Sequence, residues 1–577
     1  MLAYVARHRR AYLTGFVLSL FSTALQLVNP WVLRVAVDGI RSGTAIRTLL
    51  ALAATYVAVA ASGGIIRFFW RMQMLGAGRR IDYEIRNDYF AHLQRLHQGF
   101  FQHTRTGDLM ARATNDLNAV TRLVSAGLMH FSNTLVMFLA ACVLMFTIDR
   151  PLALLVMVIL PMVSVVFVVL GRRIHHQFEA VQEQFSALSA RAQENFSGIR
   201  VVKAFAQEAA EVATFSDINR EYVVRALRLA RTAGILWPAM SLILGTASAL
   251  VLWQGGSAVV AGRITLGQLV QFFAYLNMLS WPMIALGWTT NLIQQGMASM
   301  RRLDEIFNTR PAIASPRAAQ PRVPLHGEIE FSHVSFAYND VEVLHDINLK
   351  VPAGTTAAIV GPTGSGKTTL VSLIPRLIDP TSGTVLIDGI DIRALPLPLL
   401  RSSVGMVPQE PFLFSDTLEE NLALGVEAGD SRRVREAAEI ARLTGDVADF
   451  PLGLQTMVGE RGVTLSGGQK QRATIARAVA RDPAILILDD ALSSVDTSTE
   501  EAILTGLRRF MVERTALIIS HRISTVRGAD LIVVLDGGRI VERGTHEALV
   551  AAGRLYADLH RKQILRDALE ADEAVPS

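Results

Sequence analysis

Cysteine and charge are both scarce in this sequence of 577 residues. The single cysteine, Cys142, lies inside an apolar run, so an internal disulfide is excluded and the role of a small buried hydrophobe is expected. Charged residues make up only 19% and hydrophobic residues 51%, whereas a soluble protein usually carries about a quarter charged residues. The composition therefore indicates that much of the chain sits in lipid.

The positive balance of charge does not indicate a nucleic-acid surface. The net charge is +5, but the basic residues are spread beside apolar runs and form no long block. Such placement is typical of the cytoplasmic flanks of membrane helices. The basic start, residues 1–10, leads into an apolar stretch of membrane-crossing length without a small-residue cleavage site. We expect a first membrane helix there, not a cleaved signal peptide.

Six apolar stretches are long enough to cross a bilayer core, which takes about 20 helical residues. They cover residues 11–34, 46–70, 126–148, 151–171, 233–260 and 265–291. Arginine clusters precede the first stretch and follow the second, fourth and sixth, which predicts that both termini face the cytoplasm. Arginines at the opposite ends, such as Arg34 and Arg150, are a weaker contrary signal.

Two of the connections between these stretches, residues 71–125 and 172–232, are long, charged and helix-patterned. Helical hairpins that extend the spans well beyond the bilayer fit them better than simple turns. Polar stretches at residues 106–116 and 198–210 mark the predicted tips, although solvated helical surface is the simpler interpretation of their composition. The sequence thus predicts an all-α transmembrane domain over residues 1–310.

A linker and a second domain follow. Residues 310–325 contain Pro311, Pro316, Pro321 and Pro324. From Gly327 onward, short β-branched runs alternate with helical ones, which is typical of an α/β fold. We predict a linker at residues 311–325, an α/β domain at 326–562 and a C-terminal tail at 563–577.

A glycine-rich loop follows the predicted strand at residues 356–360 and precedes a helix. It reads Gly361-Pro362-Thr363-Gly364-Ser365-Gly366-Lys367-Thr368-Thr369. This is the pattern G-x-x-x-x-G-K-[ST] in the strand–loop–helix context that it requires. Its glycines let backbone N–H groups surround phosphates, Lys367 is expected to meet the β and γ phosphates, and the Thr368 hydroxyl is expected to hold Mg²⁺. The loop therefore predicts an ATP site.

Two acidic residues follow another predicted strand, residues 484–488. Asp489 stands where a P-loop ATPase needs the carboxylate that orders Mg²⁺. Asp490 follows at once, in a position to polarise the attacking water. Together with the glycine-rich loop, this pair predicts ATP hydrolysis.

The run Leu465-Ser466-Gly467-Gly468-Gln469 lies between these motifs and resembles the signature of the ATP-binding-cassette (ABC) family. Other positions resemble further marks of that family: Tyr338 the aromatic that stacks on adenine, Gln409 the glutamine that touches Mg²⁺ and senses the γ-phosphate, residues 459–462 a loop of exporters, Asp496 the dimer-contacting loop and His521 the switch histidine. Six spans fused ahead of one cassette resemble bacterial type IV exporter-fold half-transporters. The resemblance covers essentially the whole chain.

This resemblance implies how the sites are assembled. In the family, the signature residues Ser466, Gly467, Gly468 and Gln469 cap the ATP that a partner cassette binds, so that two ATP molecules lie within a head-to-tail dimer. The implied site residues are Asp490, His521 and Gln409 for catalysis, Tyr338 with residues 361–369 for ATP, and Thr368, Gln409 and Asp489 for Mg²⁺. Asp496 would contact the partner.

Asp490 departs from the family, which usually has glutamate at this position. Aspartate retracts the carboxylate by about 1.5 Å, one C–C bond length. A general base needs a short hydrogen bond to the proton it removes, so the resemblance implies slow hydrolysis at this site. Such a substitution often marks one member of a heterodimer whose other site is competent. A homodimer that tolerates aspartate is the alternative.

The resemblance implies ATP-driven export of an amphipathic small molecule, lipid or peptide by alternating access, from a bacterial inner membrane. Uptake through the same fold and a nucleotide-gated regulator or channel remain alternatives, whereas the six spans exclude soluble cassette proteins. The cargo itself cannot be read from the sequence. Arg67, an ionisable residue in the second stretch, is a candidate cavity residue, with snorkelling to the interface as its alternative.

Overall fold

The computed structural model describes residues 2–316, 324–426, 430–459 and 465–573. The chain packs as two compact units. We call residues 1–94 and 105–309 the helical unit, and residues 95–104 and 310–577 the α/β unit.

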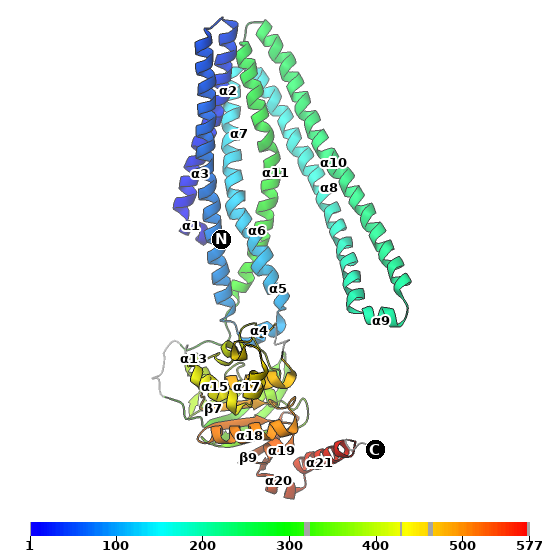
Figure 1. Cartoon of the computed structure of the whole chain (residues 1–577). Helices are drawn as coiled ribbons and strands as arrows, with labels where there is room; N and C mark the ends of the chain where they lie inside the picture. Colours follow the sequence, from blue (N-terminus) through cyan, green and yellow to red (C-terminus); the bar gives the residue numbers. More distant parts are fainter. Residues whose placement is uncertain (1, 317–323, 427–429, 460–464, 574–577) are drawn as a thin grey trace. The chain divides into compact units, whose positions relative to one another are not determined.

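The helical unit consists of long helices and short connections (Figure 1). Its long helices are α2 (Arg9–Arg41), α3 (Ile46–Leu93), α7 (Leu128–Ile148), α8 (Arg150–Ser197), α10 (Glu208–Val260) and α11 (Leu266–Asn308). Its short helical segments are α1 (Leu2–Arg7), α5 (Thr106–Ala111), η1 (Arg112–Asp116), α6 (Leu117–Arg122), η2 (Leu123–Gly127) and α9 (Ile199–Ala204). The all-α prediction for this part of the chain is confirmed.

Among the described residues, five helical runs are long and apolar enough to cross a membrane. They are Arg9–Arg41, Ile46–Leu93, Thr106–Ile148, Arg150–Ser197 and Glu208–Val260, and they contain the first five predicted stretches. The sixth stretch, residues 265–291, lies almost entirely within α11, which is not one of these runs. The sixth span therefore stays a prediction.

Local sequence explains where two of the long helices begin. The Asp149 carboxylate accepts the Leu152 N–H at 3.0 Å and so caps α8. Thr265 and Gln268 form a capping box at the start of α11, where each side chain accepts the backbone N–H of the other residue. These caps satisfy N–H groups that have no partner within the helix.

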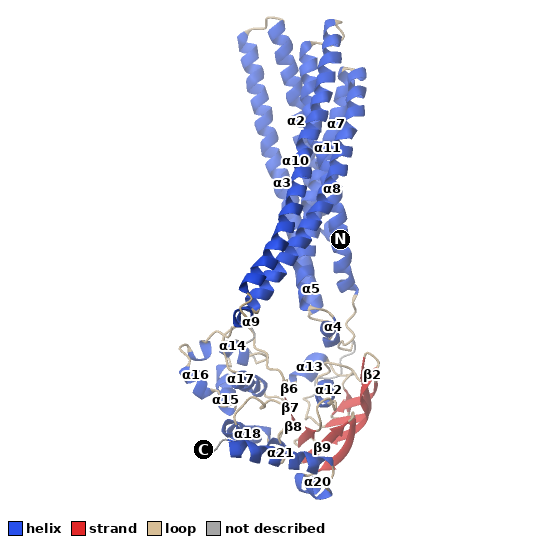
Figure 2. Ribbon diagram, turned by 90° about the vertical axis from the view of Figure 1, so that its right-hand side faces the viewer, coloured by secondary structure: helices blue, strands red, loops and turns tan. Residues whose placement is uncertain are grey.

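The structure places the turn of the second long hairpin where it was predicted and the turn of the first hairpin earlier in the chain. Helices α8 and α10 run side by side and are joined by α9, as predicted for residues 198–210 (Figures 1 and 2). In the first hairpin the turn is at residues 94–105, and residues 106–116 form the beginning of the returning helix. The predicted first tip is therefore too late in the chain. The physical reason is that Asp108 lies in the first turn of α5, where a carboxylate favours helix.

The α/β unit contains two sheets, and Figure 2 shows its strands in red. The smaller sheet is antiparallel with the order β2-β1-β4-β5: β2 (Val341–Val351), β1 (Ile329–Tyr338), β4 (Ser382–Ile387) and β5 (Ile390–Asp391). The larger sheet has the order β10-β9-β3-β8-β7-β6: β10 (Arg539–Gly544), β9 (Leu531–Asp536), β3 (Thr356–Val360), β8 (Thr515–Ile519), β7 (Ile485–Asp489) and β6 (Val404–Val407). Strands β9 to β6 are parallel, and β10 pairs antiparallel to β9.

The α/β unit also contains helices. They are α4 (Gln98–His103), α12 (Lys367–Leu373), α13 (Leu397–Ser402), α14 (Leu418–Leu422), α15 (Ser431–Ile440), α16 (Thr444–Asp449), η3 (Gly453–Gln455), α17 (Gly467–Ala480), α18 (Thr497–Met511), α19 (Ile523–Val526), α20 (His546–Ala552) and α21 (Leu555–Glu573). Helix α21 runs across the predicted start of the tail at residue 563. The predicted α/β character is confirmed.

Alternate residues of the central strands enter two different cores. Ala357 and Ile359 of β3 pack with the small sheet and α12, whereas Ala358 and Val360 pack with α15, α17 and α18. Both faces of the strand are therefore buried, which is why it reads as a continuous apolar run and not as an alternating one. Because β3, β8, β7 and β6 are parallel, the residues that follow these strands lie at the same edge of the sheet, at the carboxyl ends of the strands.

Candidate functional site

The carboxyl ends of four parallel strands bring the main predicted residues together. The glycine-rich loop follows β3, Asp489 ends β7, and His521 and Gln409 come two residues after β8 and β6. A hollow of about 240 Å³ at this edge is lined by residues from all four strand ends, including Lys367, Thr368, Gln409, Asp489, Asp490 and His521. The edge of a parallel sheet at its carboxyl ends is where α/β proteins bind ligands.

The glycine-rich loop needs its glycines. Gly361, Gly364 and Gly366 have φ of +154°, +81° and +98°, which side chains rarely allow. A Cβ on Gly361 would lie 2.0 Å from the Leu535 carbonyl oxygen, so the loop passes directly against β9. A Cβ on Gly364 would meet open space, and Gly364 lines the hollow. The backbone is therefore bare on the side where phosphates would lie.

Lys367 is buried, and its cation lies inside the loop. Its Nζ donates to the carbonyl oxygens of Gly361 at 3.0 Å and Pro362 at 2.8 Å. Burial lowers the pKa of Lys367, and the nearby carboxylates of Asp489 and Asp490 oppose that shift. The structure thus places a positive charge among backbone groups, beside two acids.

Asp489 is the most buried acid at this edge, with 1% of its surface exposed. Its Oδ2 atom has no hydrogen-bond partner. Burial raises the pKa of Asp489, while the neighbouring Thr368 hydroxyl and the charge of Lys367 lower it less. A buried, unpartnered carboxylate oxygen beside a hydroxyl offers the hard oxygen ligands that Mg²⁺ prefers, so these residues fit the ion.

Asp490 is half-buried and has a backbone conformation that is uncommon for aspartate. Its φ is +48°, and its N–H donates to the Ile519 carbonyl oxygen at 2.9 Å, which ties it to β8. His521 and Gln409 are exposed beside it. The aspartate side chain therefore projects from a fixed backbone position into the hollow.

Other predicted residues lie elsewhere in the α/β unit. Tyr338 is at the end of β1, is 37% exposed and packs its ring against Phe336 at 4.6 Å between centroids. It does not line the hollow, and its predicted role on adenine stays a prediction. Gly459 is described, whereas residues 460–462 of the predicted exporter loop lie outside the described residues.

The signature residues form the start of α17. Ser466 and Gln469 make a capping box, and Gly467 and Gly468 are the first residues of the helix. Ser466 is exposed, and none of these residues lines the hollow. The signature thus does not meet the glycine-rich loop of its own chain.

Asp496 caps α18. Its carboxylate accepts the Thr499 N–H at 2.9 Å and the Ser498 hydroxyl at 2.7 Å. These bonds lower the pKa of Asp496 to about 2, so it is charged at neutral pH. The side chain is exposed.

Gln471 is a site residue that motif reading missed. It is 3% exposed, its Nε2 donates to the Ser493 hydroxyl at 2.9 Å, and its Oε1 accepts the Ser494 N–H at 2.8 Å. The signature helix is thereby fastened to the loop between Asp490 and Asp496. Because Gln471 stands between Lys470 and Arg472 in the sequence, its burial could not be read from its neighbours.

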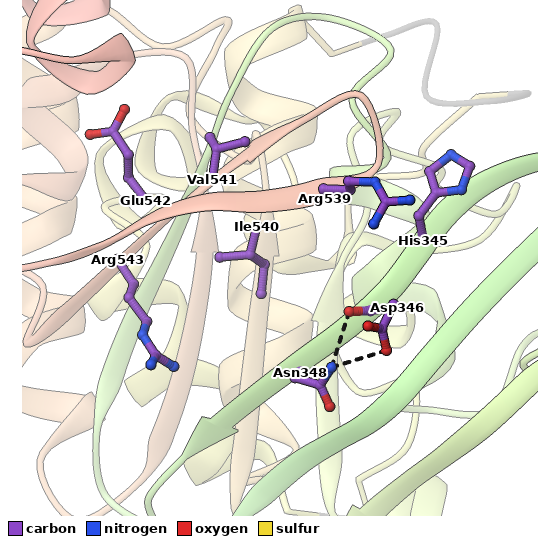
Figure 3. A pocket seen from close by; sticks show the side chains of 8 residues that line it. All are labelled: His345, Asp346, Asn348, Arg539, Ile540, Val541, Glu542 and Arg543. Carbon is purple, nitrogen blue, oxygen red and sulfur yellow. Dashed lines mark hydrogen bonds between the residues drawn. The ribbon is translucent and has the colours of Figure 1, made fainter.

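A larger hollow, of about 310 Å³, lies between β2 and β10 and holds none of the predicted site residues (Figure 3). In it, the Asn348 amide donates at 3.1 Å to both the carbonyl and the carboxylate oxygen of Asp346. The Asp346 carboxylate also accepts His333 at 2.7 Å. This groove contains neither the glycine-rich loop nor the carboxyl ends of the parallel strands, so it is a weaker candidate than the smaller hollow.

Comparison with known proteins agrees with this geometry. Residues 12–283 match the family described as ABC transporter transmembrane region, and residues 344–493 match the family described as ABC transporter. The chain is 36% identical over 564 residues to the probable multidrug resistance ABC transporter ATP-binding/permease protein YheI of Bacillus subtilis (strain 168), covering 97% of this chain and 96% of that one.

It is also 37% identical over 571 residues to the multidrug resistance-like ATP-binding protein MdlA of Escherichia coli (strain K12), covering 98% and 96% of the two chains. An ATP-dependent lipid A-core flippase of Syntrophus aciditrophicus (strain SB) is 37% identical over 500 residues, covering 87% of this chain and 83% of that protein. Among solved structures, a bacterial Atm1-family ABC exporter with ATP bound has a TM-score of 0.80 at 30% identity, covering 96% of this chain and 98% of that one.

Proposed function

Since the chain belongs to the ABC transporter family, we propose that it uses ATP to export an amphipathic small molecule, lipid or peptide across a bacterial inner membrane. Membership of the family makes it an ATPase coupled to transmembrane transport. The observation that carries the proposal is the presence, in one chain, of the hollow at the strand ends and of five helices able to cross a membrane. The multidrug and flippase relatives support the class of cargo.

ATP would be held by residues 361–369, with the adenine stacked on Tyr338. The Nζ of Lys367 would leave the two loop carbonyls that it now contacts and donate to the β and γ phosphates. Phosphate oxygens are charged acceptors and bind an ammonium more strongly than neutral carbonyls do. The open side of the loop at Gly364 would let backbone N–H groups approach the phosphates.

Thr368, Asp489 and Gln409 would hold Mg²⁺. When bound, the ion supplies positive charge that offsets the negative charge of the phosphate oxygens. The unpartnered Oδ2 of Asp489 supports this assignment, because a buried carboxylate oxygen without a partner destabilises the fold.

Asp490 would accept the proton of the attacking water, and His521 would donate to the γ-phosphate. A glutamate at this place would reach further into the hollow by about 1.5 Å, one C–C bond. The backbone of Asp490 is held by its bond to Ile519 and by its positive φ, so it cannot easily advance to make up the difference. We therefore expect slow hydrolysis at the site that this loop forms.

A second cassette would complete each ATP site. ABC exporters work as dimers, and the signature of this chain begins a helix that does not line its own hollow. Ser466 and the two following glycines would cap the ATP of the partner, and charged Asp496 would contact it. A heterodimer is favoured because Asp490 weakens one site while the signature that serves the other is intact. A homodimer that tolerates aspartate is the alternative.

The long hairpins would carry movement of the cassettes to the membrane helices. Residues 95–104, at the tip of the first hairpin, pack as part of the α/β unit. The tip of the second hairpin exposes apolar side chains, including Val201 at 61% and Phe205 at 71%. Exposed apolar residues at the end of a long hairpin suit a docking site on the partner's cassette.

Transport into inside-out vesicles separates export from the alternatives. The purified assembly would be reconstituted into lipid vesicles, and Mg-ATP would be added to the outside. A fluorescent lipophilic cation and a labelled phospholipid would serve as probes. Export predicts ATP-dependent accumulation inside the vesicles, lost in Lys367→Ala. Depletion from preloaded vesicles would instead indicate uptake through the same fold. Nucleotide binding with no net movement of any probe would favour a gated channel or regulator.

A further inference from the structure

Glu500 is a buried acid that no motif accounts for. It lies in the first turn of α18 and is 3% exposed. Its Oε1 accepts the Thr525 hydroxyl at 2.6 Å, and its Oε2 accepts the guanidinium of Arg522. A carboxylate this deeply buried needs hydrogen-bond donors, and here one oxygen has a neutral hydroxyl and the other a charged guanidinium.

The residues that Glu500 contacts lie beside the switch histidine. Arg522 directly follows His521, and its N–H donates to the Ser520 hydroxyl at 3.0 Å. The guanidinium of Arg522 also reaches the Val495 carbonyl at 3.5 Å, directly before Asp496. The arginine therefore contacts the chain on both sides of Asp496.

The far side of the same turn is also fixed. The Ile523 N–H donates to the Gln563 side chain of α21 at 2.6 Å. Residues 520–525 are thus held between α18 and α21, and His521 is exposed, as is Ser524. Its direction into the hollow depends on where these flanking bonds place its backbone.

We propose that Glu500 is a positioning residue: through Arg522 and Thr525 it keeps His521 and the Asp496 loop in one fixed register. The proposal rests on the proposed function and deepens the account of the same site. His521 faces the ATP of its own chain, whereas Asp496 faces the partner. A movement of the Asp496 loop at the dimer interface would therefore be transmitted through the Glu500–Arg522 pair to His521, which contacts the γ-phosphate.

A buried ion pair is weak evidence for a stabilising role, because hydrophobic residues of similar volume often serve as well. In this protein the ion pair would act by fixing the positions of the residues around it. A shift of about 1 Å in a group that contacts reacting atoms can reduce turnover by a hundredfold. Loss of the pair should consequently lower turnover more than it lowers ATP affinity, which depends on residues 361–369.

The test uses the full transporter assembly and compares Glu500→Gln with Glu501→Gln, the neighbouring exposed acid of α18. We expect Glu500→Gln to lower kcat for ATP about tenfold, with KM for ATP changed less than about twofold, because contacts to phosphate are untouched. Glu501→Gln should match the wild type. Arg522→Lys keeps the charge but replaces the planar guanidinium by an ammonium on a shorter side chain, so kcat should fall there too.

The double variant Glu500→Gln/Arg522→Gln supplies the rescue. In Glu500→Gln the partly buried guanidinium of Arg522 loses its charged partner, whereas the double variant places two neutral amides there, so kcat should recover in part relative to Glu500→Gln. The proposal is overturned if Glu500→Gln keeps the kcat of Glu501→Gln, or if KM rises with kcat unchanged. It is also overturned if lost activity only follows a lower melting temperature and a smaller nucleotide-binding fraction. Absence of ATPase in the wild-type assembly would instead count against the proposed function.

Discussion

In the α/β unit the polar side chains that face the hollow come from four strand ends and meet in one place, whereas in the helical unit buried polar side chains form small groups scattered along long helices. Thr23, for example, donates across helices to Asn133 at 3.2 Å, while Gln271 and Thr289 each keep a buried oxygen without a partner. The first arrangement identifies chemistry, because its members are matched to phosphate and Mg²⁺. The second arrangement is matched to no particular ligand. The ligand of the cassette can therefore be inferred from its side chains, whereas the cargo of the membrane helices cannot.

This contrast predicts that single changes in the cassette abolish activity, whereas single changes in the helical unit act through packing. The largest expected effect is at Lys367. Lys367→Ala removes the buried cation of the loop and should reduce ATP hydrolysis by at least about a hundredfold. The matched control is Lys350→Ala, since Lys350 is an exposed lysine of β2 that pairs with Glu328 at 3.0 Å. Steady-state ATPase assays measure both variants. If Lys367→Ala were as active as Lys350→Ala, the hollow would not be the site of ATP hydrolysis.

A smaller effect of opposite sign is expected at Asp490. Asp490→Glu extends the carboxylate into the hollow and should raise ATPase activity about tenfold, because general-base catalysis requires hydrogen-bond reach. Glu501→Asp changes the length of an exposed acid nearby and should leave activity unaltered. An Asp490→Glu variant no faster than wild type would refute the geometric argument.

Asp489 links the chemistry of the hollow to stability. A carboxyl whose pKa is raised by burial stabilises the folded state only while protonated, and that contribution is lost as pH rises from about 4 through the raised pKa. Without nucleotide, Asp489→Asn should therefore stabilise the cassette at neutral pH by about 1 to 3 kcal/mol, since it removes a buried charge whose Oδ2 atom has no partner.

Thermal unfolding between pH 4 and 8 measures this, and the advantage of Asp489→Asn should grow with pH. The same variant should lose the extra stabilisation that Mg-ATP gives over ATP alone. A stabilisation that is equal at all pH values would show that the charge of Asp489 is not the cause.

The helical unit supplies a prediction of packing alone. A Cβ on Gly267 would lie 2.4 Å from the Arg34 carbonyl oxygen and 2.6 Å from the Asp38 carboxyl carbon, whereas one on Gly256 would meet nothing within 4 Å. Gly267→Ala should destabilise the unit by about 1 to 3 kcal/mol and Gly256→Ala should not. Melting temperatures in detergent compare them. Equal melting would mean that α2 and α11 are not held this closely.

Local patterns sufficed for the residues whose neighbours in space are also neighbours in sequence. Each of these motifs is a short stretch of sequence. The loop at residues 361–369 joins a strand to a helix, Asp489 and Asp490 follow one strand, and Ser466 caps one helix. Their convergence at one sheet edge could be inferred, because parallel strands share the direction of their carboxyl ends.

The remainder depended on contacts between distant segments. Gln471 and Glu500 bind residues 22 to 25 positions away, and a polar residue in a helix does not disclose such a partner. The first hairpin tip was misplaced because Gly107 and Asp108 suit a turn and a helix start equally well. The sixth predicted stretch, residues 265–291, lies almost entirely within the helix α11, and its crossing of the membrane stays a prediction.

The central claim is that the signature of this chain closes over a nucleotide held by another cassette. Replacing Cys142 by alanine leaves no cysteine, so Ser466→Cys gives a single reporter at an exposed helix start. In the purified assembly, maleimide labelling of this thiol should be fast without nucleotide and strongly slowed by Mg-ATP. Labelling that proceeds at the same rate with and without Mg-ATP, at every protein concentration, would contradict the claim.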